Sequence, residues 1–441
     1  MRAGQAPGAW PVVGHLPDLL RRPLAFMDSL PAHGDIVRVR IGLRDAYVLC
    51  HPELVRRVLT DSRVFDREGP LYEKVRAALG NGLASCPRAD HRGQRRVLQP
   101  AFHHKRLERY AQVMSVEVET LTDRWRSGQV VDAVDEMFRL TTAVAVRTLF
   151  SSDFPAPVAE ELRDCLDVFL RGVYTRVLMP AVDAVPSPGR RRYRRALVRW
   201  RALVSGIIAE YRAAGVDQDD VLSLLLAARD DSGRPLSDHE LCDQVALLVL
   251  AGAETTSSAL AWCVQLLGSH SDVLDRLQTE ADTVLGGSIA TWDDLPDLTF
   301  THRVVQEVLR LYPPAWAITR TTVEPVELAG EQLALGSMVI CSPYVIHRRD
   351  DFFPDAAAFD PDRWQNGHPH REAYLPFGLG ANKCIGEAFG LAEATLALAS
   401  LVSRWHLRPL PTRSSKAAPR SVLAPGSLPV LVDARLPTPR P

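Results

Sequence analysis

The sequence predicts a mainly α-helical protein with a minor β region, folded as one large domain over residues 1–441. Residues 71–311 are dominated by arginine-rich amphipathic stretches of helical period, such as residues 91–110. Alternating runs typical of strands occur within residues 1–60, and short strands are expected again over 312–345. Because no internal repeat or clear linker divides the chain, many helices with a small sheet favour a single domain.

Composition and charge exclude several classes of protein. Hydrophobic residues make up 46% of the chain and charged residues 24%, which is enough for a large core. The formal net charge is -1, so nothing points to nucleic acid or to an anionic membrane as a partner. The Cys count of 7 is odd and includes no CxxC pair, which fits a reducing cytosol.

The chain shows no pattern of a secretory signal or a membrane anchor. Prolines and glycines interrupt residues 1–20, where a signal peptide would need a continuous apolar stretch. The longest conspicuous apolar run, residues 245–253, is far shorter than the roughly 20 residues of a membrane span. We therefore expect a cytoplasmic protein.

A long central helix is predicted from near Ser237 to about residue 268. Ser237 and Glu240 match a capping box, and the helix is apolar on most faces, so it should cross the middle of the domain. One more long helix is expected over about 385–405, and the segment around Pro425 looks like a hairpin.

The strongest chemical motif is PFGLGANKCIGEAFG, residues 376–390. Gly378, Gly380 and Gly386 allow the backbone to approach a bulky group closely. Cys384 stands at the start of an amphipathic helix, where free N–H groups and the helix dipole favour a thiolate. Such a loop presents one sulfur to iron. An isolated cysteine is more often a buried apolar residue, so the interpretation depends on the whole loop.

Two further groups of residues have an ordinary interpretation when each is taken alone. Residues 251–256, AGAETT, are typical of a kinked core helix with a polar cluster, because threonine hydroxyls can bond to preceding carbonyls. Glu307 and Arg310, at i and i+3 of one helix, are typical of a surface ion pair, which contributes less than about 1 kcal/mol to stability.

The cysteine loop resembles the cytochrome P450 family. Its FxxGxxxCxG haem-binding signature is matched by Phe377, Gly380, Cys384 and Gly386. The chain departs from the family at Asn382, where an Arg or His usually contacts a haem propionate. Lys383 or another cation would have to compensate for that missing charge.

The other motifs follow in the family's order. Residues 251–256 resemble its AGx[DE]T[TS] oxygen-activation groove, which implies that Glu254 and Thr255 relay protons. Glu307 and Arg310 resemble its ExxR element. With Arg363 of the FDPDRW segment, the resemblance implies a buried charge cluster that braces the cysteine loop.

Three cations resemble the residues that bind haem propionates in this family: His91, Arg95 and Arg320. A planar and permanently charged guanidinium suits a carboxylate. As lone residues, each would more often be a solvated surface cation. In the absence of a cation at Asn382, we expect these three to carry most of the haem anchoring.

The resemblance implies a P450-like fold with haem b (iron protoporphyrin IX) between the central helix and the cysteine-loop helix of residues 376–405. Cys384 is then the axial iron ligand. The implied activity inserts one oxygen atom of O2 into an apolar small molecule, and the other atom leaves as water. The chain carries no flavin or iron–sulfur motif, so electrons would come from a ferredoxin and its NAD(P)H-linked ferredoxin reductase. Arg92 and Arg96, with Lys383, offer a docking face for an acidic partner on what we expect to be a monomer.

The substrate is predicted from longer segments of the chain. Four segments are most similar to actinobacterial terpene oxidases of the pentalenene and epi-isozizaene kind: PLAFMDSLPAHGDIVRVRIG, RRVLQPAF, SPYVIHRRD and FDPDRW. This similarity implies a sesquiterpene or related terpenoid of secondary metabolism and antibiotic biosynthesis, with a fatty acid or a polyketide as the alternative. By family position, Ala251, Trp316 and Ile318 face the pocket, which should be closed by residues 66–90, 165–185 and 422–426.

Two other functions remain open at this point. One is a peroxide-driven fatty-acid peroxygenase, but such family members lack the acid–threonine pair found at Glu254 and Thr255. The other is a haem-binding sensor or carrier that never activates oxygen, which would need neither a proton relay nor a reductase.

Overall fold

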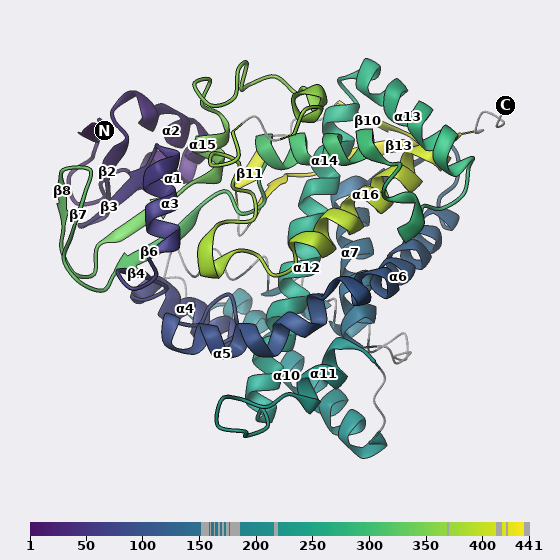
Figure 1. Ribbon diagram of the computed structural model, residues 1–441, viewed down its shortest axis with the longest axis horizontal. Helices are drawn as coiled ribbons and strands as arrows, with labels where there is room; N and C mark the ends of the chain where they lie inside the picture. Colours follow the sequence, from purple (N-terminus) through teal and green to yellow (C-terminus); the bar gives the residue numbers. More distant parts are fainter. Residues whose placement is uncertain are drawn as a thin grey trace.

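The computed structural model describes residues 1–150, 186–215, 219–367, 370–411, 417–419 and 422–435, together with single positions between 158 and 176. Helices make up most of the molecule, and the largest sheet gathers with the N-terminus on one side (Figure 1). This arrangement confirms the predicted mainly helical class with a minor β region.

The central helix is α12, Asp238–Leu267, and it runs through the middle of the molecule (Figure 1). The predicted capping box starts it: the Ser237 hydroxyl accepts the Glu240 N–H at 3.3 Å, and the Glu240 carboxylate accepts the Ser237 N–H at 2.8 Å. Among the described residues, only α12 is long and apolar enough to cross a membrane. Its apolar window is 67% buried, as expected of a core helix.

The longest helices pack around α12. They are α6 (His104–Asp123), α7 (Ala133–Leu149), α10 (Pro188–Ala214), α13 (Ser271–Leu285), α14 (Thr299–Leu311) and α16 (Glu387–Arg404). The shorter helices are α1 (Leu16–Arg21), α2 (Pro23–Ser29), α3 (Pro52–Thr60), α4 (Pro70–Leu79), α5 (Arg88–Leu98), α11 (Val221–Ala227) and α15 (Pro343–His347). The main hydrophobic core lies between α6, α7, α12, α14 and α16.

The main sheet has six strands in the order β1-β2-β3-β9-β6-β4. Their bounds are β1 Ala3–Gln5, β2 Ile36–Ile41, β3 Arg44–Leu49, β4 Phe65–Asp66, β6 Ile318–Thr322 and β9 Met338–Cys341. The edge strand β4 is antiparallel to β6, with Phe65 opposite Thr322 and Asp66 opposite Thr321. This register brings the start of the segment from residue 66 to residue 90 beside the strand that carries Arg320.

Three smaller sheets complete the β region. One is formed by β10 (Trp405–Pro409), β13 (Pro429–Ala434) and β5 (Gln129–Asp132), one by β11 (Ala417–Pro419) and β12 (Leu423–Pro425), and one by β7 (Val326–Leu328) and β8 (Glu331–Leu333).

The expected hairpin around Pro425 is wrong, because the strands on its two sides belong to different sheets: β12 pairs with β11, and β13 pairs with β10 and β5. The segment is tied to α12 instead. The Leu423 carbonyl accepts the Ser258 hydroxyl at 2.7 Å and the Trp262 indole N–H at 2.8 Å.

Candidate active site

A cavity of about 590 Å³ lies between α12 and the cysteine loop. Ala251 and Thr255 line it from α12, while Phe377, Cys384 and Gly386 line it from the loop. The structure therefore brings together the two motifs that the sequence placed about 130 residues apart, on opposite walls of one mostly apolar chamber.

Cys384 is the one exposed cysteine of the seven, all of which the structure describes. Its exposure is to the cavity, since the residue is otherwise enclosed by protein. Burial raises the pKa of the thiol, an effect that the Gly386 N–H opposes. The sequence predicted that the start of the following helix would favour the Cys384 thiolate. Because α16 begins only at Glu387, three residues further on, the effect of burial on the thiol pKa is the larger one.

Two glycines shape the cysteine loop for different reasons. Gly380 has φ +69°, and a Cβ there would lie 2.7 Å from the Leu59 carbonyl oxygen, so only glycine fits against the end of α3. Gly378 has φ +68°, and a Cβ there would have Ile318 as its nearest neighbour at 3.8 Å. Gly380 thus fixes the loop on the scaffold, and Gly378 borders the cavity.

The two residues of the AGAETT segment predicted to relay protons, Glu254 and Thr255, are placed differently. Thr255 lines the cavity, and its hydroxyl donates to the Ala251 carbonyl at 2.6 Å. Glu254 is partly buried and is not part of the cavity wall. Gly252 borders α7 closely, since a Cβ there would lie 3.4 Å from that of Ala145. The glycine thus allows α7 to approach α12.

One end of the cavity is strongly basic. Arg67 and Arg320 both line it and are only 9% and 3% exposed, respectively. His91 is buried nearby, and its pKa is lowered to about 4 by burial and by the charges of Arg67, Arg95 and Arg320. No sequence motif indicates Arg67, because it is a single arginine next to a short edge strand.

Arg95 contacts the cysteine loop itself. Its Nη1 group donates to the carbonyls of Ala381 and Lys383, at 3.1 and 2.7 Å. Arg95 and His91 line a basic surface hollow of about 1330 Å³ behind the loop, and Asn382 borders both this hollow and the inner cavity. Lys383 forms an ion pair with Glu387, so its ammonium group is already neutralised.

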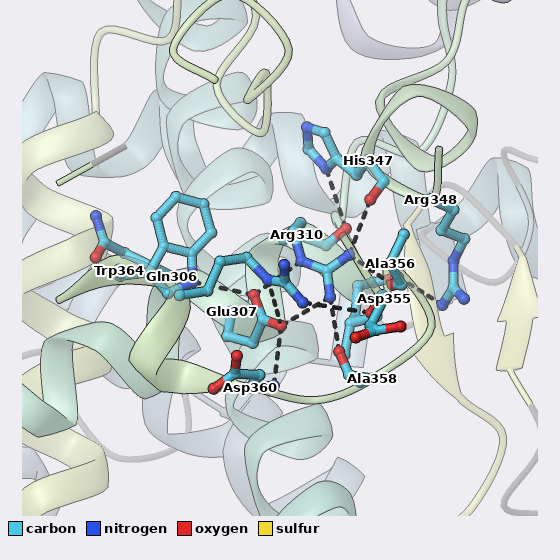
Figure 2. Close-up of polar contacts among 12 residues, drawn as sticks. Gln306, Glu307, Arg310, His347, Arg348, Asp355, Ala356, Ala358, Asp360 and Trp364 are labelled. Atoms are coloured by element: carbon cyan, nitrogen blue, oxygen red, sulfur yellow. Dashed lines mark hydrogen bonds and ion pairs between the residues drawn. The ribbon is translucent and has the colours of Figure 1, made fainter. Parts of the chain in front are cut away.

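The structure brings together Glu307, Arg310 and Arg363 as a buried charge cluster. Figure 2 shows Glu307 and Arg310 facing each other at its centre. Arg310 Nε and Nη2 donate to the two Glu307 carboxylate oxygens at 2.8 and 2.7 Å, and both side chains are fully buried. Arg363 Nε lies 3.5 Å from Glu307, which also accepts the Trp364 indole N–H at 3.0 Å. The pair is therefore not the surface ion pair that its spacing alone suggested.

His347 links this cluster to the cysteine loop, which the sequence did not reveal. Its Nδ1 lies 3.0 Å from the Arg310 carbonyl, and its Nε2 accepts the Leu375 N–H at 2.8 Å. Burial lowers its pKa to about 3, so the ring is neutral. Leu375 directly precedes the PFGLGANKCIG loop.

The predicted pocket residues are only partly together. Ala251 and Ile318 line the cavity, but Trp316 does not. Its neighbours Ala315 and Ala317 line the cavity instead, while Trp316 packs against the hydrophobic cluster that includes Phe26.

The segments expected to close the pocket also differ. Residues 66–90 contribute Arg67, Tyr72 and Ala84 to the cavity wall. Residues 422–426 are not part of that wall. The closing role predicted for residues 165–185 lies almost entirely outside the described residues.

The chemistry of the cavity fits haem. A single thiol faces apolar walls, and two buried guanidiniums at one end suit the two carboxylates of the porphyrin. A thiol below a long helix with a threonine on its wall, and a buried Glu–Arg pair behind the thiol's loop, define a haem-thiolate protein. The chain belongs to the cytochrome P450 family, whose model matches residues 5–431, and is a monooxygenase with a haem cofactor.

The chain is similar along nearly its whole length to enzymes of two Streptomyces species. It is 43% identical over 440 residues to the pentalenene oxygenase of Streptomyces avermitilis, covering 99% of this chain and 98% of that protein. It is 45% identical over 437 residues to the cyclooctatin synthase of Streptomyces melanosporofaciens, covering 98% and 95%. These similarities confirm the predicted resemblance to terpene oxidases.

Solved structures share the fold. The retinoic acid-bound cyanobacterial CYP120A1 superposes with a TM-score of 0.86 at 26% identity, covering 98% of this chain and 99% of that one. The haem domain of cytochrome P450DA superposes with a TM-score of 0.87 at 27% identity, covering 99% of both chains.

Proposed function

We propose that this monooxygenase binds haem b through Cys384 and oxygenates an apolar terpenoid, in the first instance a sesquiterpene, within secondary metabolism. The observation that carries the proposal is the similarity at 43–45% identity to two enzymes named for terpenoid compounds. A third relative at 43% identity, a cyclooctat-9-en-7-ol 5-monooxygenase, also acts on a terpenoid according to its name.

The cavity wall supports an apolar substrate. The wall near α12 and β6 consists of small or branched side chains, including Leu248, Ala251, Ala315, Ala317 and Ile318. The charged groups that line the cavity, Arg67 and Arg320, lie at the basic end and suit the haem carboxylates. A fatty acid would need a further cation for its carboxylate, so this wall favours a hydrocarbon.

The α12 residues supply the proton chemistry of the proposed reaction, while the haem supplies oxygen activation when bound. The Thr255 hydroxyl, which donates to the Ala251 carbonyl, can release that bond and hold a proton at the cavity wall. In this proposal Glu254, which is partly buried and lies outside the cavity wall, passes protons to Thr255. The reaction consumes O2, two electrons and two protons, and it yields one hydroxylated product and one water.

The basic hollow behind the cysteine loop supports an acidic electron donor such as a ferredoxin, itself reduced by an NAD(P)H-linked reductase. Arg88, Arg92 and Lys105 line this hollow on the side of the loop away from the substrate cavity. Arg96 also lines it but is paired with Asp231. We expect Arg92→Glu to slow reduction by a ferredoxin at low ionic strength. Arg22→Glu, at an exposed residue between α1 and α2, should leave the rate of reduction unchanged. The proposed enzyme is a cytoplasmic monomer.

Two experiments test the proposed function. The reduced, carbon monoxide-bound protein should show the Soret band of thiolate-ligated haem, Cys384→Ala should lose it, and Cys242→Ala should keep it. A thiolate spectrum in Cys384→Ala would overturn the ligand assignment.

For the substrate, sesquiterpene hydrocarbons, a long-chain fatty acid and a polyketide macrolactone are compared with a surrogate ferredoxin and reductase. We expect one labelled oxygen atom from isotopic O2 in a terpenoid product, detected by mass spectrometry. Turnover of the fatty acid or the macrolactone alone would replace the proposed substrate class.

A further inference from the structure

Two arginine side chains share the basic end of the cavity without a carboxylate partner. Among the described residues, Arg67 Nη1 donates to the Leu83 carbonyl at 2.7 Å, and Arg320 Nη1 to the Thr319 carbonyl at 2.7 Å, and neither forms an ion pair. Burial lowers the pKa of Arg67, and the Arg320 charge lowers it further. Because unpaired buried charges are strongly destabilising, this end of the cavity favours binding of an anion.

The fold brings the two arginines together at the end of one strand pair, and both line the same cavity. Arg67 directly follows β4, and Arg320 lies in β6. These two strands pair antiparallel with Asp66 opposite Thr321, so the next pair in this register is Arg67 and Arg320. Figure 1 shows β4 and β6 together at the edge of the sheet nearest α4 and α5. A carboxylate at this end of the cavity would therefore meet both arginines.

Arg67 is held rigidly in this position. Its backbone N–H donates to Asp66 at 2.7 Å, and its carbonyl accepts Arg76 Nη1 at 2.9 Å. Asp66 does not neutralise it by direct contact, because the Asp66 carboxylate is engaged by the backbone N–H groups of Arg67 and Arg88. A guanidinium anchored at one nitrogen keeps its other donors for a ligand, and little side-chain entropy is lost on binding.

The other candidate groups near this site are neutral or already engaged. Asn382 is neutral where the family usually has a cation, and burial lowers the pKa of His91 to about 4. Lys383 is paired with Glu387, and Arg95 donates to two loop carbonyls. Arg67 lines the same cavity as Asn382 and carries the permanent charge that position 382 lacks.

We propose that Arg67, paired with Arg320, binds a haem propionate and takes the place of the basic residue that is absent at position 382. This inference rests on haem binding, which the family assigns, and not on the proposed substrate.

The test measures haem release to excess apomyoglobin, not turnover. Arg67→Gln should release haem at least about tenfold faster than the wild type, because it loses a charge-assisted contact. Haem dimethyl ester, whose carboxylates are blocked, should leave wild type and Arg67→Gln at equal rates. The exposed Arg63 of the same segment provides the control, and Arg63→Gln should behave as the wild type.

Adding Asn382→Arg to Arg67→Gln should restore slow release of natural haem. If Arg67→Gln does not fold, Arg67→Lys serves in its place, with faster release of natural haem and unchanged release of the ester. Equal release of natural haem by wild type and the variant would overturn the proposal. So would an equal acceleration for natural and esterified haem, which would give Arg67 a purely structural role. A wild-type protein that never binds haem would instead overturn the cofactor itself.

Discussion

Arg310 and His347 hydrogen-bond to each other in both directions. Arg310 Nη1 donates to the His347 carbonyl at 2.8 Å, and His347 Nδ1 lies 3.0 Å from the Arg310 carbonyl. Because His347 Nε2 accepts the Leu375 N–H, its Nδ1 carries the proton and donates it. The charge cluster on α14 is thus joined to the chain segment that leads into the cysteine loop through one neutral imidazole.

Replacing His347 tests this link. His347→Ala leaves the Leu375 N–H and the Arg310 carbonyl without a partner and opens a cavity, so we expect about 3 kcal/mol of lost stability. The loss should be measured by urea unfolding of the haem-bound protein and accompanied by faster haem loss. His103→Ala, at an exposed histidine, should change the free energy of unfolding by less than about 0.5 kcal/mol. A similar effect of both substitutions would mean that the imidazole does not hold the loop.

The Glu307 carboxylate is the centre of the charge cluster. It accepts bonds from Arg310, Arg363, Trp364 and the Asp360 N–H, so Glu307→Ala leaves two buried guanidiniums unpaired. We expect a loss of about 3–5 kcal/mol in the free energy of unfolding, or a failure to fold with haem. Asp18→Ala, which removes an exposed ion pair with Arg22, should cost less than about 1 kcal/mol. Near-equal losses in the two variants would contradict a buried bracing role.

The fold class, the cysteine loop, the α12 motif and the Glu307–Arg310 element could be predicted from the sequence alone. Each is a local pattern that can be recognised within a short stretch of the chain. The residues it missed act through contacts between distant segments. Arg67 reaches the cavity only because β4 pairs with β6, and His347 is important only because α15 lies against α14 and residue 375. Trp316 was misplaced because a family position does not say on which side of an extended chain a side chain points.

In the proposed reaction the proton passes through the Thr255 hydroxyl, which lies on the cavity wall. In Thr255→Ala we expect electrons to be diverted to hydrogen peroxide, with the product formed per NAD(P)H falling by about tenfold or more. Ser257→Ala is the matched control, because that hydroxyl donates to the Glu254 carbonyl at 3.0 Å and does not line the cavity. Peroxide and product are measured together under turnover, and unchanged coupling in Thr255→Ala would remove Thr255 from the proton path.

Glu393 should make the stability of the protein depend on pH. It is fully enclosed on α16, and burial raises its pKa to about 8, against a small opposing effect of the Thr256 hydroxyl. Neither carboxyl oxygen makes a hydrogen bond of good geometry with a described residue. Between its unfolded pKa of 4.5 and about 8, the folded protein therefore keeps a proton that the unfolded chain has lost.

The sign of the effect follows from proton linkage. The folded state binds more protons in that window. The contribution of Glu393 to the free energy of unfolding is therefore greatest below pH 4.5 and falls as the pH rises toward about 8. The slope is about 1.4 kcal/mol per pH unit at most. Glu393→Gln removes the titrating group, so the difference in unfolding free energy between wild type and variant should change steadily across this window and level off above it. Denaturation of both proteins in a pH series measures that difference, and parallel curves would show that Glu393 titrates normally.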